Sequence, residues 1–237
     1  MKKVKLGILI SGRGSNMQAL IEACQNRNFP AEVVCAITNN SEAAGLKIAE
    51  QAGVPAFIVR DKPLDADKIH EIFVQHKVDL ICLAGFMRIL QANFLSKWNN
   101  KVINIHPSLL PSFKGLNAQE QALKAGVKIA GCTVHYVTPE IDAGAIIAQV
   151  AVPVLPADDI QSLSERILAE EHKCYVEALP NKSYQLRFRL LHQSSEKTQA
   201  NENSEFAIER LNRLSSAVSP DTPRIITKTI DKLVKFH

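Results

Sequence analysis

The fold is decided by the stretch VKLGILISGRGSN, residues 4–16. Its first seven residues are mostly apolar, which predicts a strand buried on both faces. Two glycines then mark a tight turn, and Ser15–Cys24 has the spacing of an amphipathic helix that begins at Ser15. A strand that passes through a glycine turn into a helix is the start of a βαβ unit, so the sequence predicts a parallel sheet.

The same alternation continues along the chain. Further strands are expected at Val33–Thr38, Ala56–Val59, Val78–Ala84 and Val102–Ile105, and further helices at Glu42–Gln51, Asp65–His76 and Asn117–Ala125. Cys132–Val137 and Ala145–Val152 are typical of two strands with no helix between them, which indicates an antiparallel pair at one side of the sheet. Asp158 and Asp159 suit the N-terminus of a helix that continues to Leu179, because carboxylates favour that end of a helix. The expected fold is α/β: a mostly parallel, twisted, Rossmann-like sheet with helices on both faces and one antiparallel edge.

Composition indicates a globular protein of the cytoplasm. The 237 residues are 46% hydrophobic and 22% charged, enough to bury a full core. No apolar run approaches the roughly 18 residues that span a bilayer, and the N-terminus lacks a signal-peptide pattern. The five cysteines are widely spaced and form no Cys-x-x-Cys pair, so neither a disulfide framework nor a zinc site is expected.

The C-terminal stretch differs from the rest in charge and pattern. Residues 180–237 hold ten Lys and Arg against six Asp and Glu, which accounts for the net charge of +4. We therefore expect a catalytic domain over residues 1–179 and a basic, partly disordered extension over residues 180–237, with a polar linker at Ser194–Ser204 and weak helical patterns at Phe206–Leu214 and Pro223–Phe236. A contact with nucleic acid or membrane is one interpretation of such a tail, and a solvated extension is the one favoured.

The glycine turn after the first strand is a candidate phosphate site. Glycines and the amides at a helix N-terminus can cradle an anion, and Ser15 and Asn16 add donors. The dinucleotide fingerprint is absent because Met17 stands where it needs a glycine, and the P-loop lysine is absent too. One terminal phosphate therefore fits better than a pyrophosphate. A well-capped helix that binds no ligand is the alternative.

Asn104 and His106 form the strongest candidate for chemistry. In the expected strand Val102–Ile105, the period of two places both polar side chains on one face, toward the ligand crevice at the carboxyl end of the strand. An amide can donate to a developing oxyanion, and a histidine can donate or transfer a proton near neutral pH. Pro107 and Pro111 should stiffen the loop that follows.

Three other segments leave two interpretations open. Asp142 lies on a tight turn that Gly144 allows through a positive φ, and it is either a turn residue or a partner of His106. Glu171 continues the apolar stripe of Ile160, Leu163 and Ile167, so its carboxylate either forms an ion pair or accepts from sugar hydroxyls. The apolar residues of the segment at 83–90 need a cover, which is either protein packing or a flat aromatic ligand.

Five segments together resemble the phosphoribosylglycinamide formyltransferase family of purine synthesis. They are SGRGSN (11–16), LAGFMRIL (83–90), NIHPSLLP (104–111), GCTVHYVTPEIDAG (131–144) and EEH (170–172). The resemblance runs in order from Val4 to about Leu179 and ends at Pro180. It implies the formyltransferase fold, with Asn104, His106 and Asp142 as catalytic residues.

The resemblance also implies two substrate subsites. The ribonucleotide would be held by Gly14, Ser15 and Asn16 at its phosphate and by Glu171 at its ribose. The folate would be held by Met87, Arg88, Ile89, Leu90 and Asn104, and by the backbone of residues 138–142. His135 matches a family histidine whose role is left open. The stretch around Arg60 and Lys62 is shortened where the family often has a folate-contacting arginine, and Pro139 replaces a usual acidic residue.

The implied activity is transfer of a formyl group from 10-formyltetrahydrofolate, a co-substrate, to the amine of N1-(5-phospho-D-ribosyl)glycinamide, with no metal. Asn104 and protonated His106 would stabilise the oxyanion while Asp142 orients His106. The implied partners are these small molecules, with no nucleic acid and no membrane, and the protein would be a monomer or homodimer. The alternatives are formyltetrahydrofolate deformylase, a hydrolase whose family carries an added N-terminal domain; methionyl-tRNA formyltransferase, whose second domain is larger; and a non-catalytic nucleotide-binding module.

Overall fold

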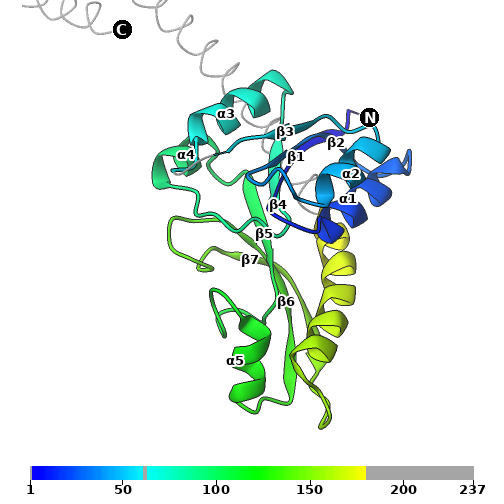
Figure 1. The fold of residues 1–237 in the computed structure, drawn as a ribbon, viewed down its shortest axis with the longest axis vertical. Coiled ribbons are helices and arrows are strands. Elements are labelled where there is room, and N and C mark those ends of the chain that lie inside the picture. The colour runs from blue at the N-terminus through cyan, green and yellow to red at the C-terminus, as the bar shows by residue number, and fades with distance from the viewer. Residues whose placement is uncertain (1, 61–62, 180–237) are drawn as a thin grey trace, which may run out of the picture. The chain divides into compact units, whose positions relative to one another are not determined.

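The computed structural model describes residues 2–60 and 63–179, which contain one seven-stranded sheet. The strands are β1 (Val4–Ile10), β2 (Ala31–Thr38), β3 (Ala56–Ile58), β4 (Leu80–Leu83), β5 (Val102–His106), β6 (Ile129–Tyr136) and β7 (Ile146–Pro153). Their order in the sheet is β3-β2-β1-β4-β5-β6-β7 (Figure 1). β1 to β5 pair in parallel, whereas β6 and β7 pair antiparallel, which confirms the predicted fold class.

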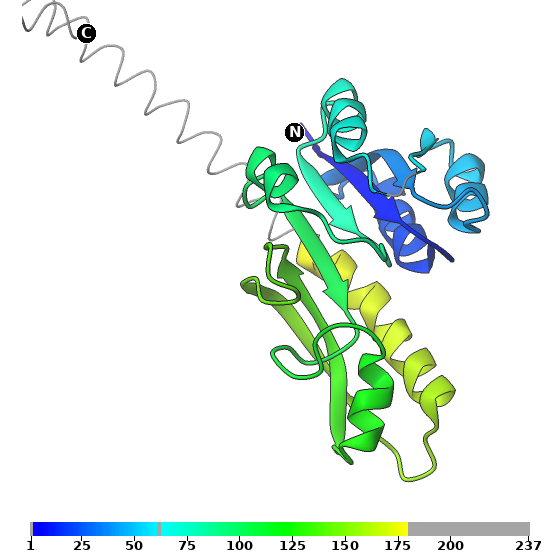
Figure 2. The ribbon, with the colours of Figure 1, turned by 60° about the vertical axis from the view of Figure 1, so that its left-hand side comes forward.

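Helices cover both faces of the sheet. They are α1 (Ser15–Gln25), α2 (Gly45–Gln51), α3 (Ala66–Gln75), α4 (Ala92–Lys97), α5 (Ala118–Lys124) and a last helix over residues 160–179. In Figures 1 and 2, α1, α2 and the last helix lie on one side of the parallel strands and α3 and α4 on the other, while α5 lies beside β6. None of the helices in the described ranges is both long and apolar enough to cross a membrane.

The core follows the predicted pattern of buried strands. Six of the seven residues of β1 are buried, as expected for a central parallel strand covered on both faces. On one face, Phe73 of α3 and Phe94 of α4 pack with Trp98. On the other, Tyr175 of the last helix is fully buried and its hydroxyl donates to the carbonyls of β4 Leu83 and β5 Ile103. The last helix is therefore fixed across two central strands.

Some local predictions needed correction, and one helix was missed. The helix expected from Glu42 begins at Gly45, because the Asn40 side chain accepts from the Glu42 amide and holds a turn there. The strand expected from Cys132 begins at Ile129, which pairs with Pro153 of β7. Helix α4 was not predicted. Ile160, placed on the core stripe of the last helix, is 51% exposed, whereas Leu163 and Ile167 are fully buried.

The proposed boundary at residue 180, the polar segment Ser194–Ser204 and the two C-terminal helical patterns all lie outside the described residues.

Candidate active site

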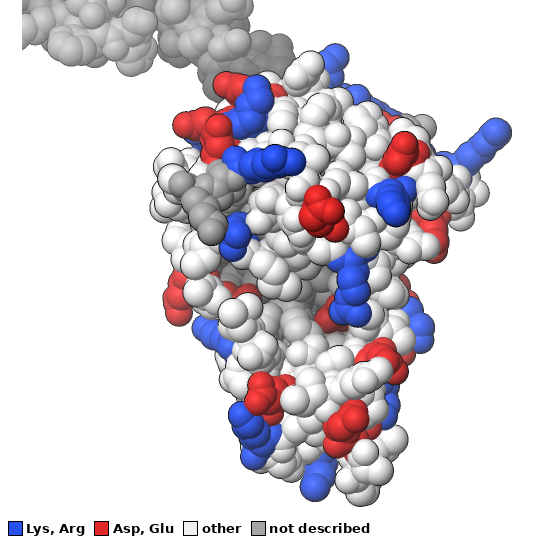
Figure 3. All heavy atoms as spheres, viewed as in Figure 1, with Lys and Arg blue, Asp and Glu red and all other residues white. Residues whose placement is uncertain are grey.

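The strand order reverses between β1 and β4, because β2 and β3 lie beyond β1 while β5 to β7 lie beyond β4. At such a point the loops after the two strands separate and leave a crevice at their carboxyl ends. Here those loops are residues 11–14 and residues 84–91, and the Ser11 amide donates to the Gly85 carbonyl at 3.2 Å. The surface is hollowed near the centre of the face in Figure 3, where acidic and basic side chains are interspersed.

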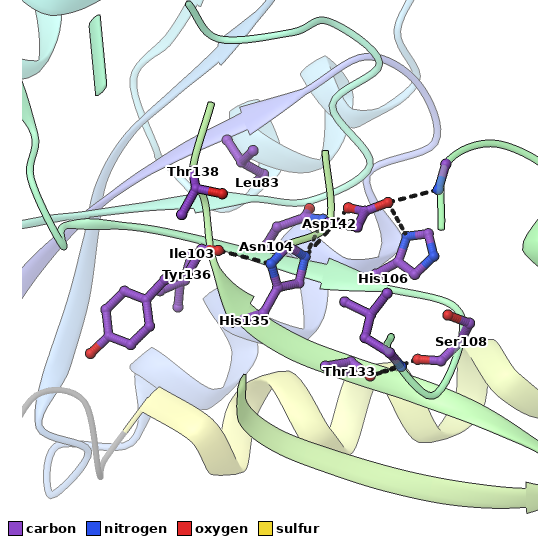
Figure 4. A network of polar contacts seen from close by, with 12 residues as sticks. Leu83, Ile103, Asn104, His106, Ser108, Thr133, His135, Tyr136, Thr138 and Asp142 are labelled. Atoms are coloured by element: carbon purple, nitrogen blue, oxygen red, sulfur yellow. Dashed lines mark hydrogen bonds and ion pairs between the residues drawn. The ribbon is translucent and has the colours of Figure 1, made fainter. Parts of the chain in front are cut away.

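Asn104 and His106 lie on β5 two residues apart, and the antiparallel register places His135 of β6 opposite Asn104. Asn104 Nδ2 lies 3.2 Å from His135 Nε2. The turn after β6 brings Asp142 back over the same place, so that its carboxylate lies between His106 and His135 (Figure 4). One amide, two imidazoles and one carboxylate thus converge within a largely buried cluster.

Asp142 is held by both its backbone and its carboxylate. Its φ of 48° is left-handed, a conformation that Asp adopts more readily than most residues. Oδ2 accepts from the Gly115 amide at 2.8 Å and lies 3.4 Å from His106 Nδ1. The predicted positive φ at Gly144 was wrong, because the turn places that conformation at Asp142. Gly144 is required instead for space, since a Cβ there would lie 1.8 Å from the Tyr136 carbonyl oxygen.

His106 has an acceptor at each ring nitrogen. Nε2 lies 2.9 Å from the Phe113 carbonyl oxygen, and Nδ1 faces Asp142. A ring with a proton on each nitrogen donates to both acceptors, whereas either neutral tautomer satisfies only one. The predicted contact of His106 with Asp142 is therefore present, and Phe113 is a partner that the sequence did not reveal.

His135 has a different set of partners. Nδ1 donates to the Tyr136 carbonyl at 2.9 Å, which leaves Nε2 as the acceptor for the Asn104 amide. Asp142 Oδ1, 3.5 Å away, forms an ion pair only with a protonated ring. Burial lowers the pKa of His135 below its ordinary value, although the Tyr136 bond and the Asp142 charge oppose this shift. We therefore assign His135 as neutral, orienting the Asn104 amide.

The turn after β1 is compact. Gly14 is the N-cap of α1 with a φ of 78°, and a Cβ on it would lie 2.7 Å from the Gly45 Cα. Glycine is therefore required at Gly14 for both conformation and space. Ser15 begins α1, so the amides of the first turn of this eleven-residue helix point out of its N-terminus.

Asn16 and Glu171 form a buried pair across 155 residues of sequence. Asn16 Nδ2 donates to Glu171 Oε2 at 2.8 Å, and Asn16 Oδ1 is buried with no hydrogen-bond partner among the described residues. Burial raises the pKa of the Glu171 carboxyl to about 7, against the Asn16 bond and the charge of Arg13. The pair therefore presents an unfilled acceptor and an ionisable oxygen beside the glycine turn.

In the loop after β4, some apolar side chains are exposed and others are buried in the core. Met87 and Ile89 are 63% and 67% exposed, whereas Leu90 is buried in the cluster that α3 and α4 cover. Arg88 is also exposed. Of the two candidates for a folate-contacting cation, Arg60 is exposed and Lys62 lies outside the described residues.

A buried polar network behind the cluster was not predicted. Thr133 Oγ1 donates to the Ser108 carbonyl and accepts from the Leu110 amide and from Gln149 Nε2. Thr133 lies opposite His106 in the β5–β6 register, and Gln149 lies opposite Thr133 on β7. The polar residues at facing positions of the two adjacent strands were the sequence feature from which this network could have been predicted.

Within residues 2–60 and 63–179, no group of three or more His, Cys, Asp or Glu is placed to hold a metal ion.

The chain is similar to known formyl transferases in both sequence and fold. The model of the formyl transferase family matches residues 4–179. Phosphoribosylglycinamide formyltransferase of Haemophilus influenzae is 40% identical over 176 residues, which cover 72% of this chain and 83% of that protein. The crystal structure of phosphoribosylglycinamide formyltransferase from Anaplasma phagocytophilum is 56% identical, with a TM-score of 0.76 and coverage of 78% of this chain and 88% of that one.

A longer relative shares the same region. The trifunctional purine biosynthetic protein adenosine-3 of Bos taurus is 48% identical over 183 residues, which are 75% of this chain but 18% of that protein. The chain thus spans less than a fifth of this relative.

Proposed function

The chain belongs to the formyl transferase family, and on that basis we propose that it transfers a formyl group from 10-formyltetrahydrofolate to the amine of N1-(5-phospho-D-ribosyl)glycinamide. The observation that carries the proposal is the cluster of Asn104, His106 and Asp142 at the carboxyl end of β5. It joins an oxyanion donor, a proton carrier and a carboxylate in one largely buried place beside the switch point of the sheet. A cytoplasmic location and action on small molecules belong to the same proposal.

The proposed reaction is a direct acyl transfer. The substrate amine attacks the formyl carbon, a C–N bond forms, and negative charge develops on the formyl oxygen. The bond from carbon to N10 of the folate then breaks, N10 gains a proton, the amine loses one, and the products are the formamide and tetrahydrofolate. Each step needs a donor for the oxygen and a path for one proton.

The contacts of the cluster suggest a role for each residue. Asn104 Nδ2 carries two protons. One is donated in a hydrogen bond to His135 Nε2, and the second is free to donate to the oxyanion. A contact of His106 Nε2 with the oxyanion replaces its bond to the Phe113 carbonyl. Asp142 Oδ2 contacts Nδ1 on the opposite edge of the His106 ring. Asp142 Oδ1 accepts a hydrogen bond from a water molecule that carries the proton away from the substrate amine.

We assign the ribonucleotide to the pair of Asn16 and Glu171 and to the glycine turn. The phosphate meets the amides around Gly14 and Ser15, where partial positive charge favours an anion. A ribose hydroxyl donates to the Glu171 carboxylate, which the bond from Asn16 Nδ2 orients. The folate contacts the loop Met87–Leu90, whose exposed Met87 and Ile89 offer an apolar surface to the pterin, and the backbone of residues 138–142.

The test is a spectroscopic assay of tetrahydrofolate formation with N1-(5-phospho-D-ribosyl)glycinamide present or omitted. The proposal expects turnover only when the amine is present. Equal turnover without it indicates a formyltetrahydrofolate hydrolase, and binding of the ribonucleotide without any turnover indicates a nucleotide-binding module. Either result contradicts the proposal.

A further inference from the structure

Ser11, the first residue of the glycine turn, has no role in the assignment above, yet its hydroxyl joins two loops. Ser11 Oγ donates to Asn39 Oδ1 at 2.7 Å, and the Met87 amide donates to Ser11 Oγ at 2.8 Å. A serine hydroxyl has one proton and two lone pairs. With the proton directed to Asn39, a lone pair is presented to Met87, so the two bonds support one orientation of the side chain.

This side chain lies at the switch point of the sheet. Ser11 follows β1, Asn39 follows β2, and Met87 lies in the loop after β4, so one hydroxyl connects segments that leave three strands. The main chain reinforces the connection, since the Ser11 amide donates to the Gly85 carbonyl and Asn40 Nδ2 donates to the Ser11 carbonyl at 3.4 Å.

Burial fixes the end of the loop at Leu90 but does little to fix its beginning at Met87. Met87 and Ile89 are 63% and 67% exposed, so their side chains supply little packing that would hold the backbone. The bond from the Met87 amide to Ser11 Oγ ties the loop to the sheet at the residue where its exposed surface begins. Its counterpart, the turn at residues 11–14, is held on the other side by the bond from the Gly45 amide to the Gly12 carbonyl.

We infer that Ser11 is a positioning residue that couples the two substrate subsites, an inference that rests on the proposed function. A phosphate bound in the glycine turn restrains the turn that begins at Ser11, and Ser11 in turn restrains the Met87 amide. The ribonucleotide therefore favours the loop conformation that binds folate, and by linkage folate favours the turn that binds the ribonucleotide.

Isothermal titration of the full chain with tetrahydrofolate, alone and at saturating N1-(5-phospho-D-ribosyl)glycinamide, tests the coupling. Ser11→Ala removes one hydrogen-bond acceptor and donor, so its Kd for tetrahydrofolate should rise about 3- to 10-fold. Its Kd for the ribonucleotide alone should stay within about twofold of the wild-type value. The ratio of the tetrahydrofolate Kd values measured without and with the ribonucleotide should fall toward one, which means that the coupling is lost. Ser11→Thr, which keeps the hydroxyl, should restore the coupling. Ser41→Ala, which removes an exposed hydroxyl bonded to Glu42, is the matched control.

A second variant keeps the inference testable if Ser11→Ala fails to fold. Asn39→Ala removes the acceptor that orients the Ser11 proton, so it should weaken tetrahydrofolate binding in the same direction. The double variant should lose no more than Ser11→Ala alone, because both act through one hydroxyl. Wild-type coupling retained in Ser11→Ala and Asn39→Ala, or equal losses for both ligands, would overturn the inference. Wild-type protein that binds neither ligand would instead contradict the proposed function.

Discussion

Glu171 is a buried carboxyl whose ionisation the surrounding protein opposes. Burial raises its pKa from 4.5 to about 7, so between these values the folded chain binds more protons than the unfolded chain. The free energy of unfolding contributed by Glu171 is therefore fully present below pH 4.5 and falls as pH rises to about 7. Glu171→Gln removes this cost and should stabilise the protein by about 1–3 kcal/mol at pH 8, with little change at pH 4.5.

Urea denaturation at the two pH values measures this difference. Glu170→Gln is the control, because Glu170 is partly exposed and pairs with Lys173 at the surface. A Glu171→Gln variant whose stability differs from wild type by the same amount at both pH values would show that the carboxyl ionises freely.

The catalytic roles proposed for Asn104, His106 and Asp142 predict the kinetic effect of replacing each residue. Asn104→Ala and His106→Ala should each lower kcat by roughly 10²–10³-fold, as expected when one oxyanion donor is lost. Asp142→Asn keeps the shape of the side chain and loses its charge, and should lower kcat by on the order of 10²-fold. The measurement is kcat and KM for each variant and for the double variant Asn104→Ala with Asp142→Asn.

If the three residues act as a unit, as we propose, the double variant should lose far less than the product of the single losses. Asn93→Ala, at an exposed position in the first turn of α4, is the control. If the losses multiply, the residues act independently and not as a unit. If Asp142→Asn keeps the wild-type kcat across the pH range, then Asp142 is a turn residue alone.

Single-residue chemistry was only partly predictable. The period of two along β5 placed Asn104 and His106 on one face, and the bonds they make in the structure agree with that arrangement. No local pattern could pair Asn16 with Glu171, because only the packing of the last helix beside α1 brings them together. The tautomer of His135 depends on the Tyr136 carbonyl and on Asn104, which are likewise set by the strand register.

At the scale of elements, the loop after β5 is fastened to β6 by one side chain. Thr133 Oγ1 satisfies the Ser108 carbonyl, the Leu110 amide and Gln149 at once and is fully buried. Thr133→Val keeps the shape and leaves buried polar groups unpaired, so we expect a loss of about 2–4 kcal/mol in the free energy of unfolding. Thr133→Ser should lose far less, because it keeps the hydroxyl. Urea denaturation of both variants decides this, and equal losses would show that the methyl group matters instead.

The strands were more predictable than the helices for a physical reason. A buried parallel strand such as β1 shows an apolar run that is visible in sequence, whereas α2 is shortened by a side-chain bond at Asn40 and α4 is only six residues long. Phe94 and Leu95 of α4 and the adjacent Trp98 are buried against α3, and this packing stabilises a helix that is too short to be recognised from its own sequence.

At the scale of the whole molecule, every residue proposed for the site lies before residue 180. A chain that ends at Ser194 should therefore keep the fold and the activity of the described domain. Circular dichroism, thermal unfolding and the formyl-transfer assay on the shortened and full chains measure this. Loss of folding or of turnover would mean that the residues beyond Ser194 contribute to the domain.

In the proposed reaction the formyl group passes to an amine rather than to water. Incubating the full chain with 10-formyltetrahydrofolate labelled with ¹³C at the formyl carbon, together with N1-(5-phospho-D-ribosyl)glycinamide, and following the label by NMR tests it directly. The label should appear in the formamide of the ribonucleotide, at a rate that Asp142→Asn lowers on the order of 10²-fold. A label that appears only in free formate would show that water is the acceptor and that the chain is not a transferase.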